Sequence, residues 1–448
     1  MTAWRILSVA AVAAAWAISG CAAPESGPPA CPCKVTNTTS GQDYFAATGT
    51  EWYSAFNQPS AQFFKGKTYI AYPDADYDPA VICFDHASQS WSKPVKVGRN
   101  PLAAEKDSHG NPALLIDKAG TLHIFYGSHT GPMQYARSAR PENIEHWQAM
   151  PAPAPKATYP QVMQMSDGTI YLFYRAGGHC DNWVYRTTRN GDKWSEPTAV
   201  LRGIPPRDAW YASFVKGPGD TVHVGFVYKD DSNLRKAPGP EFTQRYDAYY
   251  MQRRADGAWV NAAGAALTLP VAKGQAHEQC LVYDSFARQE LTGACSVGVD
   301  STNSPYLLFR TAGPYGSTSY QHKIARLQGG KWDIVEIGPA VQAGFESFVH
   351  DDNFQLQVLP AGRLRAFVVN MVAGNPVKTD LTAWDSFDNG KTWREGKTIF
   401  SSTAYPAEYV LISPKLVAQG DPEGYLVFGV DKRYLYGDAG FVKNPKPE

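Results

Sequence analysis

The sequence predicts an all-β fold, and three observations lead to this prediction. Short runs rich in β-branched and aromatic residues alternate with polar turns that contain glycine. The segments between these runs show no convincing amphipathic helix pattern. The same unit of about four short strands returns along most of the chain, which is typical of a β-propeller. We count seven units, and the sequence therefore predicts a seven-bladed β-propeller in a single domain.

Each unit starts with a polar turn and an aromatic-rich strand, and most units close at a tryptophan. The turn and strand segments are 65–72, 119–126, 167–174, 219–224, 362–367 and 424–428, with a weaker fifth unit that ends at Trp332. One such unit cannot bury both faces of its sheet, so the units have to stack around an axis. We expect a strand near Tyr44 to Phe56 to complete the last blade and close the ring. Ser386 to Trp393 matches the Asp-box S-x-D-x-G-x-T-W, a structural turn of propellers.

The N-terminal segment predicts export. Arg5 precedes an apolar run, and Ile18-Ser19-Gly20-Cys21 resembles the lipobox of bacterial lipoproteins, in which the cysteine is lipidated. Residues 22–44 are rich in proline, serine, glycine and threonine, as a flexible tether would be. The predicted organisation is a lipoprotein signal peptide over 1–21, a tether over 22–44 and a catalytic propeller over 45–448. The predicted location is the bacterial cell envelope or cell surface, through a lipid anchor.

The charge balance argues against nucleic acid and against an anionic membrane surface as partners. Lysine plus arginine and aspartate plus glutamate both number 42, so the chain as a whole has no strong field. An anionic ligand would have to be held by a local cluster. We expect a monomer.

Two histidines flank a predicted hairpin in Asp107 to His129. The strands Pro112 to Ile116 and Leu122 to Tyr126 are joined by an Asp-Lys-Ala-Gly turn, which predicts a tight antiparallel pair. His109 precedes the first strand and His129 follows the second, so both are expected on the same rim of the sheet. The alternative is that both are solvated loop histidines, but two imidazoles at one place favour a functional site.

Further candidate residues come from the next units. Tyr174 ends the strand equivalent to the one that ends at Tyr126, so its phenol is expected at the same rim. Cationic and aromatic candidates follow on later strands, although each is more often a solvated surface residue: Arg186, Arg189, Arg245 and Tyr246.

The cysteines leave two readings open. Of the seven, Cys31 and Cys33 lie in the tether, and Cys83, Cys180, Cys280 and Cys295 lie in the predicted folded part. Cys280 and Cys295 bracket a second predicted hairpin, where they would form a disulfide or remain thiols, as export permits. The other reading is a structural metal site, for zinc or calcium, in which His277 or the His179-Cys180 pair supplies further ligands, although the spacing matches no standard zinc signature.

The chain resembles the BNR-type seven-bladed propellers that include the ulvan lyases of polysaccharide lyase families twenty-four and twenty-five. The resemblance rests on H-x-x-P-x-L from His109, on G-x-L-H-x-x-Y-x-x-H up to His129, and on the strand that ends at Tyr174. It implies that His109 and Tyr174 exchange protons with a uronate while His129 and an arginine hold its carboxylate. Arg189 is the preferred arginine, and Arg245 and Tyr246 are expected sugar contacts.

Such residue types suit β-elimination at a 1,4-linked uronate. Positive charge on the carboxylate stabilises the enolate-like intermediate, a neutral imidazole accepts the C5 proton, and a phenol protonates the leaving O4. That chemistry requires no cofactor. We expect ulvan as the substrate, cleaved at its rhamnose-uronate linkage. The alternatives are a rhamnose-glucuronate exo-lyase or an α-L-rhamnosidase of the same fold, or a non-catalytic surface propeller that binds glycans.

Overall fold

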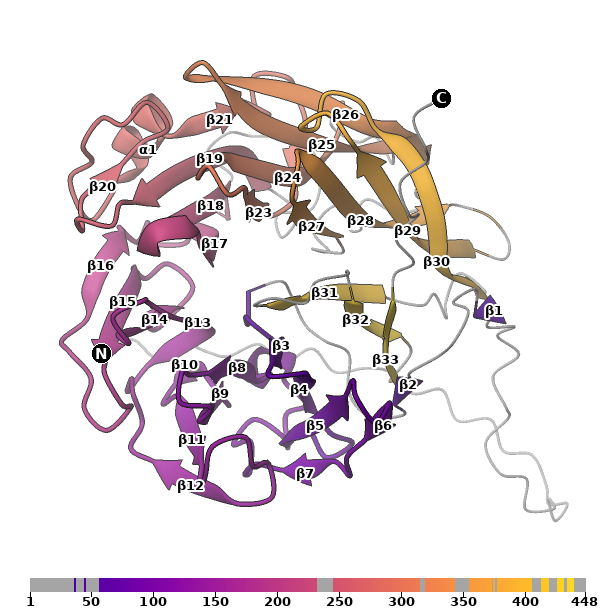
Figure 1. Ribbon diagram of the computed structural model, residues 1–448. Coiled ribbons are helices and arrows are strands. Elements are labelled where there is room, and N and C mark those ends of the chain that lie inside the picture. The colour runs from indigo at the N-terminus through magenta and orange to yellow at the C-terminus, as the bar shows by residue number, and fades with distance from the viewer. Residues whose placement is uncertain are drawn as a thin grey trace, which may run out of the picture. The chain divides into compact units, whose positions relative to one another are not determined.

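The computed structural model describes residues 56–231, 245–314, 319–342, 354–372, 374 and 377–404, together with the backbone of short strands outside these ranges. Its regular structure is almost entirely β, in six sheets (Figure 1). The described residues also form one α-helix, α1 (Lys273–Gln279), and two 3-10 turns, η1 (Ser108–Gly110) and η2 (Pro218–Asp220). None of their helices is long and apolar enough to span a membrane.

Three sheets come from the chain between Ala113 and Tyr283. The first consists of β8 (Ala113–Ile116), β9 (Leu122–Tyr126), β11 (Gln134–Ser138) and β12 (Trp147–Met150). The second consists of β10 (His129–Gly131), β13 (Ala157–Gln164), β14 (Ile170–Arg175), β15 (Trp183–Thr188) and β16 (Thr198–Leu201). The third consists of β17 (Ala209–Lys216), β18 (Val222–Lys229), β19 (Arg245–Arg253), β20 (Trp259–Val260) and β21 (Leu281–Tyr283).

The remaining sheets come from the two ends of the chain and from the segment before the C-terminal strands. One consists of β22 (Leu291–Thr292), β23 (Ser296–Val299), β24 (Pro305–Ala312), β25 (Ser319–Gln328) and β26 (Lys331–Gln342). Another consists of β27 (Phe354–Leu359), β28 (Arg363–Val372), β29 (Val377–Ser386), β30 (Arg394–Ala404) and β1 (Thr36–Asn37). The last has nine strands: β2 (Tyr44–Phe45), β33 (Arg433–Asp438), β32 (Tyr425–Val430), β31 (Ile412–Ala418), β3 (Ala61–Phe64), β4 (Lys67–Pro73), β5 (Pro79–Asp85), β6 (Ser90–Trp91) and β7 (Val95–Lys96).

The predicted number of seven blades is wrong, because the propeller has six sheets. The units counted as the first and the seventh share the nine-stranded sheet, where β3 pairs in parallel with β31 through Ala61 with Val417 and Gln62 with Ala418. Backbone pairing between strands this far apart leaves no trace in the local pattern of the sequence. The expected closing strand is present, since β2 pairs with β33.

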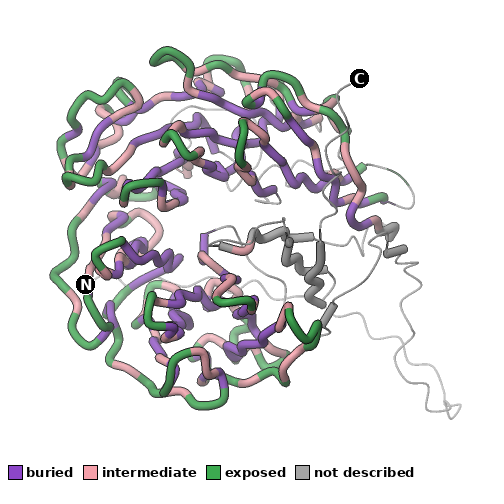
Figure 2. The backbone as a smooth tube through the Cα atoms, viewed as in Figure 1, coloured by how far each residue is buried: buried purple, intermediate pink, exposed green. Residues whose placement is uncertain are grey.

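The hydrophobic core lies between neighbouring sheets. Innermost strands contact one another in chain order, β3 with β8, β8 with β13, β13 with β17, β17 with β23 and β23 with β27. Figure 2 shows these strands buried and the connecting loops exposed. One cluster packs β8 and β9 residues such as Leu115 and Phe125 against Leu172 and Tyr174 of β14. Each large apolar side chain buried in this way contributes about 1.5–3 kcal/mol.

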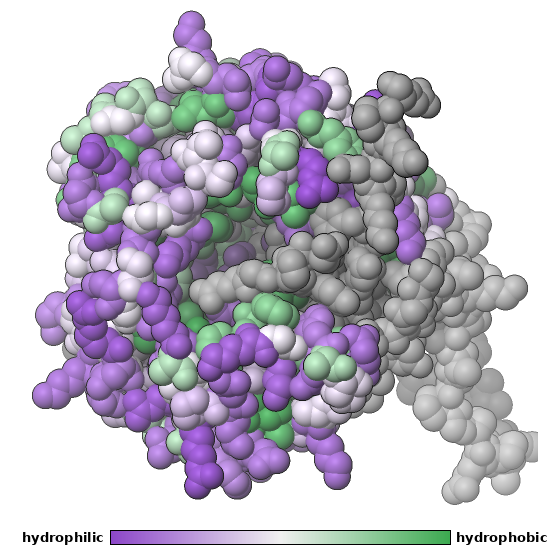
Figure 3. Space-filling model, in the orientation of Figure 1, coloured by the Kyte–Doolittle hydropathy of each residue, from purple (hydrophilic) through white to green (hydrophobic). Residues whose placement is uncertain are grey.

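A cavity of about 910 Å³ lies between the inner strands. Its walls include Ser213 of β17, Val297 of β23 and Gln357 of β27. Figure 3 shows hydrophobic residues around a central hollow and hydrophilic residues over the outer rim.

The structure confirms the predicted hairpin and the Asp-box. β8 and β9 pair antiparallel from Ala113 with Phe125 to Ile116 with Leu122. In the Asp-box, Ser386 Oγ donates to Asp388 and accepts from the Gly390 N–H.

The predicted second hairpin is wrong. β21 pairs with β19, and β22 pairs with β24, so the strands beside Cys280 and Cys295 do not pair with each other. Cys280 is an unpaired, buried thiol, and burial raises its pKa to about 12. His277 is exposed on α1. The structure therefore gives no support to a disulfide or a metal site at these three positions.

Candidate active site

Asp107 organises the loop before β8. It is the N-cap of η1, where its Oδ1 accepts the backbone N–H of His109 at 3.0 Å. The same oxygen lies 2.5 Å from Nδ1 of His109. Aspartate is a favoured N-cap because its carboxylate satisfies a backbone N–H that has no partner in the helix. One oxygen of Asp107 therefore holds both the backbone and the ring of His109.

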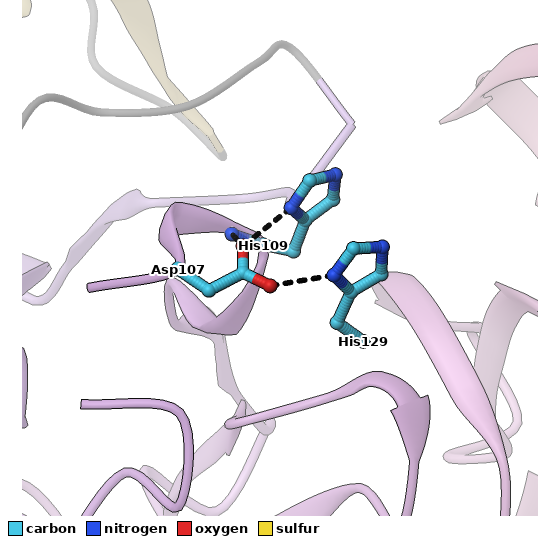
Figure 4. Close-up of side chains that lie close together, drawn as sticks. All are labelled: Asp107, His109 and His129. Atoms are coloured by element: carbon cyan, nitrogen blue, oxygen red, sulfur yellow. Dashed lines mark hydrogen bonds and ion pairs between the residues drawn. The ribbon is translucent and has the colours of Figure 1, made fainter. Parts of the chain in front are cut away.

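His129 reaches the same carboxylate from the other end of the hairpin. Its Nδ1 lies 2.5 Å from Asp107 Oδ2. The two imidazole rings stack with their centroids 3.7 Å apart and their planes within 11° (Figure 4). Both Nε2 atoms point away from Asp107 on the same side (Figure 4). The prediction that the two histidines meet at one rim is confirmed.

Burial and charge set the protonation of this group. Burial lowers the pKa of His109, the positive charges of His129 and Arg175 add to this, and the hydrogen bond to Asp107 opposes it, with a net decrease. Burial raises the pKa of Asp107, but hydrogen bonds from the His109 backbone and from both rings outweigh it, with a net decrease. His109 is thus a neutral base at neutral pH, beside an ionised Asp107.

Cross-strand pairing brings two further groups to the histidines. His129 in β10 pairs with Thr158 of β13, and Thr158 pairs with Arg175 of β14. Between Thr158 and Gln161 the register shifts, so that two residues of β13 oppose one residue of β14. Such a bulge re-aims a side chain. Tyr159 lies in the bulge with a left-handed backbone (φ 61°), an arrangement that for a bulky residue is strained and gathers at functional sites.

Tyr159 is the aromatic residue next to His109. The two ring centroids are 5.5 Å apart. The Arg175 guanidinium lies 4.9 Å from the Tyr159 ring centroid and 5.6 Å from that of Tyr211 in β17. Arg245 of β19 lies 4.3 Å from the Tyr211 ring. The group therefore continues from the histidines through Tyr159 to Arg175, and through Tyr211 to Arg245.

Arg175 is buried, with 2% of its surface exposed. Its Nε and Nη1 have no hydrogen-bond partner among the described residues. Burial raises the pKa of Tyr211, but the positive charges of Arg245, Arg175 and Lys229 outweigh it and lower the pKa below its ordinary value. Burying a polar group without a partner costs free energy, so a buried cation with unused donors favours the binding of an anion.

The segment before β3 contacts the site through Phe56 and Asn57. The Phe56 ring lies 5.2 Å from the rings of both Tyr159 and Tyr211. Asn57 Nδ2 donates to the backbone carbonyl oxygens of His109 and Asn111 at 3.1 and 2.8 Å. This segment therefore links β13 and β17 to the loop that contains η1.

Tyr174 does not lie where the sequence predicted. Its side chain packs in the core between the sheets of β8 and β14, and its hydroxyl accepts a hydrogen bond from Arg186 Nε at 3.1 Å. Consecutive residues of a strand face opposite sides, so Tyr174 and Arg175 point apart. The predicted position of the Tyr174 phenol beside the histidines is therefore wrong. The next residue, Arg175, faces the site instead, and the bulge in β13 places Tyr159 beside His109. Arg186, as the partner of Tyr174, is likewise away from the histidines.

Arg189 is also placed away from the site. Its side chain is 68% exposed and pairs with Asp167, with Nη2 3.1 Å from Oδ2, at the turn between β13 and β14. Arg245 lies beside the Tyr211 ring. Tyr246 is fully buried and packs its ring edge-on against Phe286, with centroids 5.4 Å apart. The structure thus places Arg245, but neither Arg189 nor Tyr246, in the group of side chains that includes Tyr211.

Two groups of the described residues have donor atoms close enough to hold a metal ion. One is Asp107 with His109 and His129. Each Nδ1 there faces its own carboxylate oxygen, and the nearly parallel rings do not direct their lone pairs at one point, so hydrogen bonds suit this group better. The other is Asp74, Asp76 and Asp78, whose carboxylates all contact Lys96 Nζ at 3.0–3.1 Å.

Several known proteins are similar to this chain over most of its length. An ulvan lyase of Nonlabens ulvanivorans is 29% identical, with 93% of each chain covered. An ulvan lyase of Alteromonas sp. (strain LOR) is also 29% identical, with 89% of this chain and 87% of the relative covered. A solved structure of a polysaccharide lyase, PL25-ulvanlyase, bound to -[GlcA(1-4)Rha3S]- has a TM-score of 0.74 and 24% identity, with 89% of this chain and 95% of that chain covered. This last similarity supports the propeller fold.

A family model described as a BNR repeat-containing family member matches residues 67–339, which is well over half of the chain. The matched region includes the hairpin with both histidines, Tyr159, Arg175 and Arg245. The chain belongs to the BNR repeat-containing family.

Proposed function

We propose that the protein is a polysaccharide lyase that cleaves ulvan by β-elimination at a 1,4-linked uronate. The observation that carries this proposal is one continuous group of side chains: a neutral imidazole, a phenol and a buried arginine with unused donors. The similarity to ulvan lyases over about nine-tenths of the chain supports the choice of substrate.

Arg175 binds the uronate carboxylate. The C5 proton of a uronate is weakly acidic, and the adjacent carboxylate makes its removal harder. A guanidinium offers two parallel donors that match a carboxylate, and in a buried site this charge acts strongly on the enolate-like intermediate. His129, whose Nε2 faces the same side as that of His109, gives the bound sugar a further contact.

His109 and Tyr159 transfer the protons. The pKa of His109 is lowered, so its imidazole is neutral and accepts the C5 proton. The C4–O4 bond then breaks, the Tyr159 phenol protonates the departing O4, and a 4,5 double bond remains in the uronate product. Tyr159 takes the role that the sequence predicted for Tyr174. Arg245 and Tyr211 border the sugar on the far side of Arg175.

Product analysis tests the proposed function. A lyase acting on ulvan gives an unsaturated uronate with a strong ultraviolet absorbance, whereas a rhamnosidase of the same fold gives free rhamnose without that absorbance. An exo-lyase releases only terminal units, while an internal lyase gives a ladder of oligosaccharides. A glycan-binding propeller gives no product. Absence of the unsaturated product from ulvan and from other uronate polysaccharides would refute the proposal.

We also propose that the protein is exported and held in the cell envelope by a lipid on Cys21. The lipobox-like tetrad and the tether over residues 22–44 support this, and both lie outside the described residues except for the backbone of Thr36–Asn37 and Tyr44. Metabolic labelling with a fatty acid should mark the wild type and not the Cys21→Ala variant. Equal labelling of both would contradict the proposal.

A further inference from the structure

Asp107 is the one acidic side chain that contacts both histidines of the site among the described residues. Its two oxygens are shared between the rings: Oδ1 faces Nδ1 of His109, and Oδ2 faces Nδ1 of His129, both at 2.5 Å. Oδ1 also accepts the His109 backbone N–H. The carboxylate is ionised, because these hydrogen bonds outweigh the effect of burial and lower its pKa.

An ionised carboxylate only accepts hydrogen bonds, so each Nδ1 that it contacts has to carry the proton. In a neutral imidazole with a protonated Nδ1, the lone pair is on Nε2. Both Nε2 atoms point away from Asp107 on the same side (Figure 4). One carboxylate thus decides where the accepting nitrogen of both rings lies.

We propose that Asp107 is the positioning residue of the site, which fixes both imidazoles in the Nδ1-protonated form and turns both Nε2 atoms toward the bound sugar. This inference rests on the proposed function for its catalytic meaning. Asp107 does not touch the substrate. It acts through His109 and His129, and its negative charge also stabilises the imidazolium that forms when His109 accepts the C5 proton.

The Asp107→Asn variant gives an asymmetric prediction. An amide has one accepting oxygen and one donating nitrogen. Oδ1 serves two N–H donors of His109, so the amide oxygen stays there and the amide nitrogen faces His129. The nitrogen donates, and His129 Nδ1 therefore has to accept and move its proton to Nε2. His109 keeps its tautomer. Asparagine is also a good N-cap, so η1 is retained.

Nitrogen NMR of the histidine side chains reads this directly and needs no activity. In the full-length protein labelled at histidine, above the pH at which imidazoles are charged, the wild type should show His109 and His129 both protonated at Nδ1. In Asp107→Asn, only His129 should change to the Nε2-protonated form. Signals are assigned from the His109→Gln and His129→Gln variants. Unchanged tautomers in Asp107→Asn, or a change at both rings, would overturn the inference.

Kinetics with ulvan gives the second measurement. In Asp107→Asn, kcat should fall about 10- to 100-fold, because a hydrogen bond to a charged partner is lost, while KM stays within a few-fold. Loss of the negative charge lowers the pKa of His109, so the acid limb of the kcat profile should move to lower pH by about one unit. A change in kcat without this movement would mean a merely structural role.

A matched control lies in the same hairpin. Asp117 Oδ2 lies 3.3 Å from Nε2 of His123, which is buried away from the site. Asp117→Asn should alter only the His123 signals and leave kcat and the acid limb in place. If wild-type protein forms no unsaturated product but the tautomers change as expected, the proposed function fails and the positioning role of Asp107 stands.

Discussion

Replacement of Arg175 by methionine should separate activity from stability. In the proposed complex the guanidinium faces the uronate carboxylate. Two unit charges about 4 Å apart at an effective dielectric constant near 20 interact by about 4 kcal/mol. Loss of that energy from the transition state corresponds to about a 10³-fold decrease in kcat/KM, since each 1.4 kcal/mol is tenfold.

The free energy of unfolding of the protein without substrate should not decrease in Arg175→Met. Arg175 is buried with Nε and Nη1 unpartnered among the described residues, between the rings of Tyr159 and Tyr211. Methionine places an apolar, adaptable side chain against the same rings. Replacing a buried charge by an apolar residue is often neutral or stabilising by about 1–4 kcal/mol. The free energy of unfolding of Arg175→Met should therefore equal or exceed that of the wild type.

Two measurements decide the matter: initial rates on ulvan from the absorbance of the unsaturated product, and urea unfolding of the free protein. Arg189→Met is the control, because this side chain is 68% exposed and should change the rate less than twofold. The reasoning is refuted if Arg175→Met keeps kcat/KM within a few-fold of the wild type. It is also refuted if activity falls only in step with a loss of folded protein.

Other predictions concern the acid, the pH range and metal ions. Tyr159→Phe should lower kcat about 10²-fold, as expected for loss of a general acid, whereas Tyr174→Phe should stay within a few-fold; equal losses in initial-rate assays would contradict the assignment. Burial lowers the pKa of His223 to about 4, so on acidification this histidine binds a proton in the unfolded chain at a higher pH than in the folded protein. The free energy of unfolding therefore falls as the pH drops from about 6.5 toward 4. The loss should reach about 2 kcal/mol at pH 5 in urea unfolding, and a His223→Asn variant with the same pH slope would rule out this cause. Treatment with a chelator should leave the initial rate on ulvan unchanged, because side chains supply the base, the acid and the positive charge; a loss restored by one metal ion would show otherwise.

The two histidines could be predicted from the sequence, because their positions follow from the local pattern of strands and turn. A tight turn between two apolar runs fixes the β8 and β9 pairing, and pairing fixes which ends meet. His109 and His129 were therefore predicted together, and their rings stack.

Tyr159 and Arg175 were missed because they depend on register. The sequence shows that Tyr174 and Arg175 are consecutive, but not which of them faces the histidines. Pro160 was the available signal: proline has no N–H to give to a ladder, so a strand that contains it often bulges. A bulge at that point predicts that Tyr159 leaves the regular alternation of the strand.

The number of blades was missed for a different reason. Local patterns count repeats, whereas the number of sheets depends on which strands share backbone hydrogen bonds. The pairing of β3 with β31 joins residues more than 350 positions apart in the chain. No turn or spacing in the sequence encodes it.

The parallel contact between β3 and β31 makes the two ends of the chain mutually dependent. A protein cut before Ile412 would keep the pairing of β3 with β4 but leave the other edge of β3 unpaired, and an open strand edge is a template for joining other chains. C-terminal truncation should therefore cause self-association and not merely a smaller propeller, which makes the integrity of the last repeat a requirement for keeping the protein dispersed.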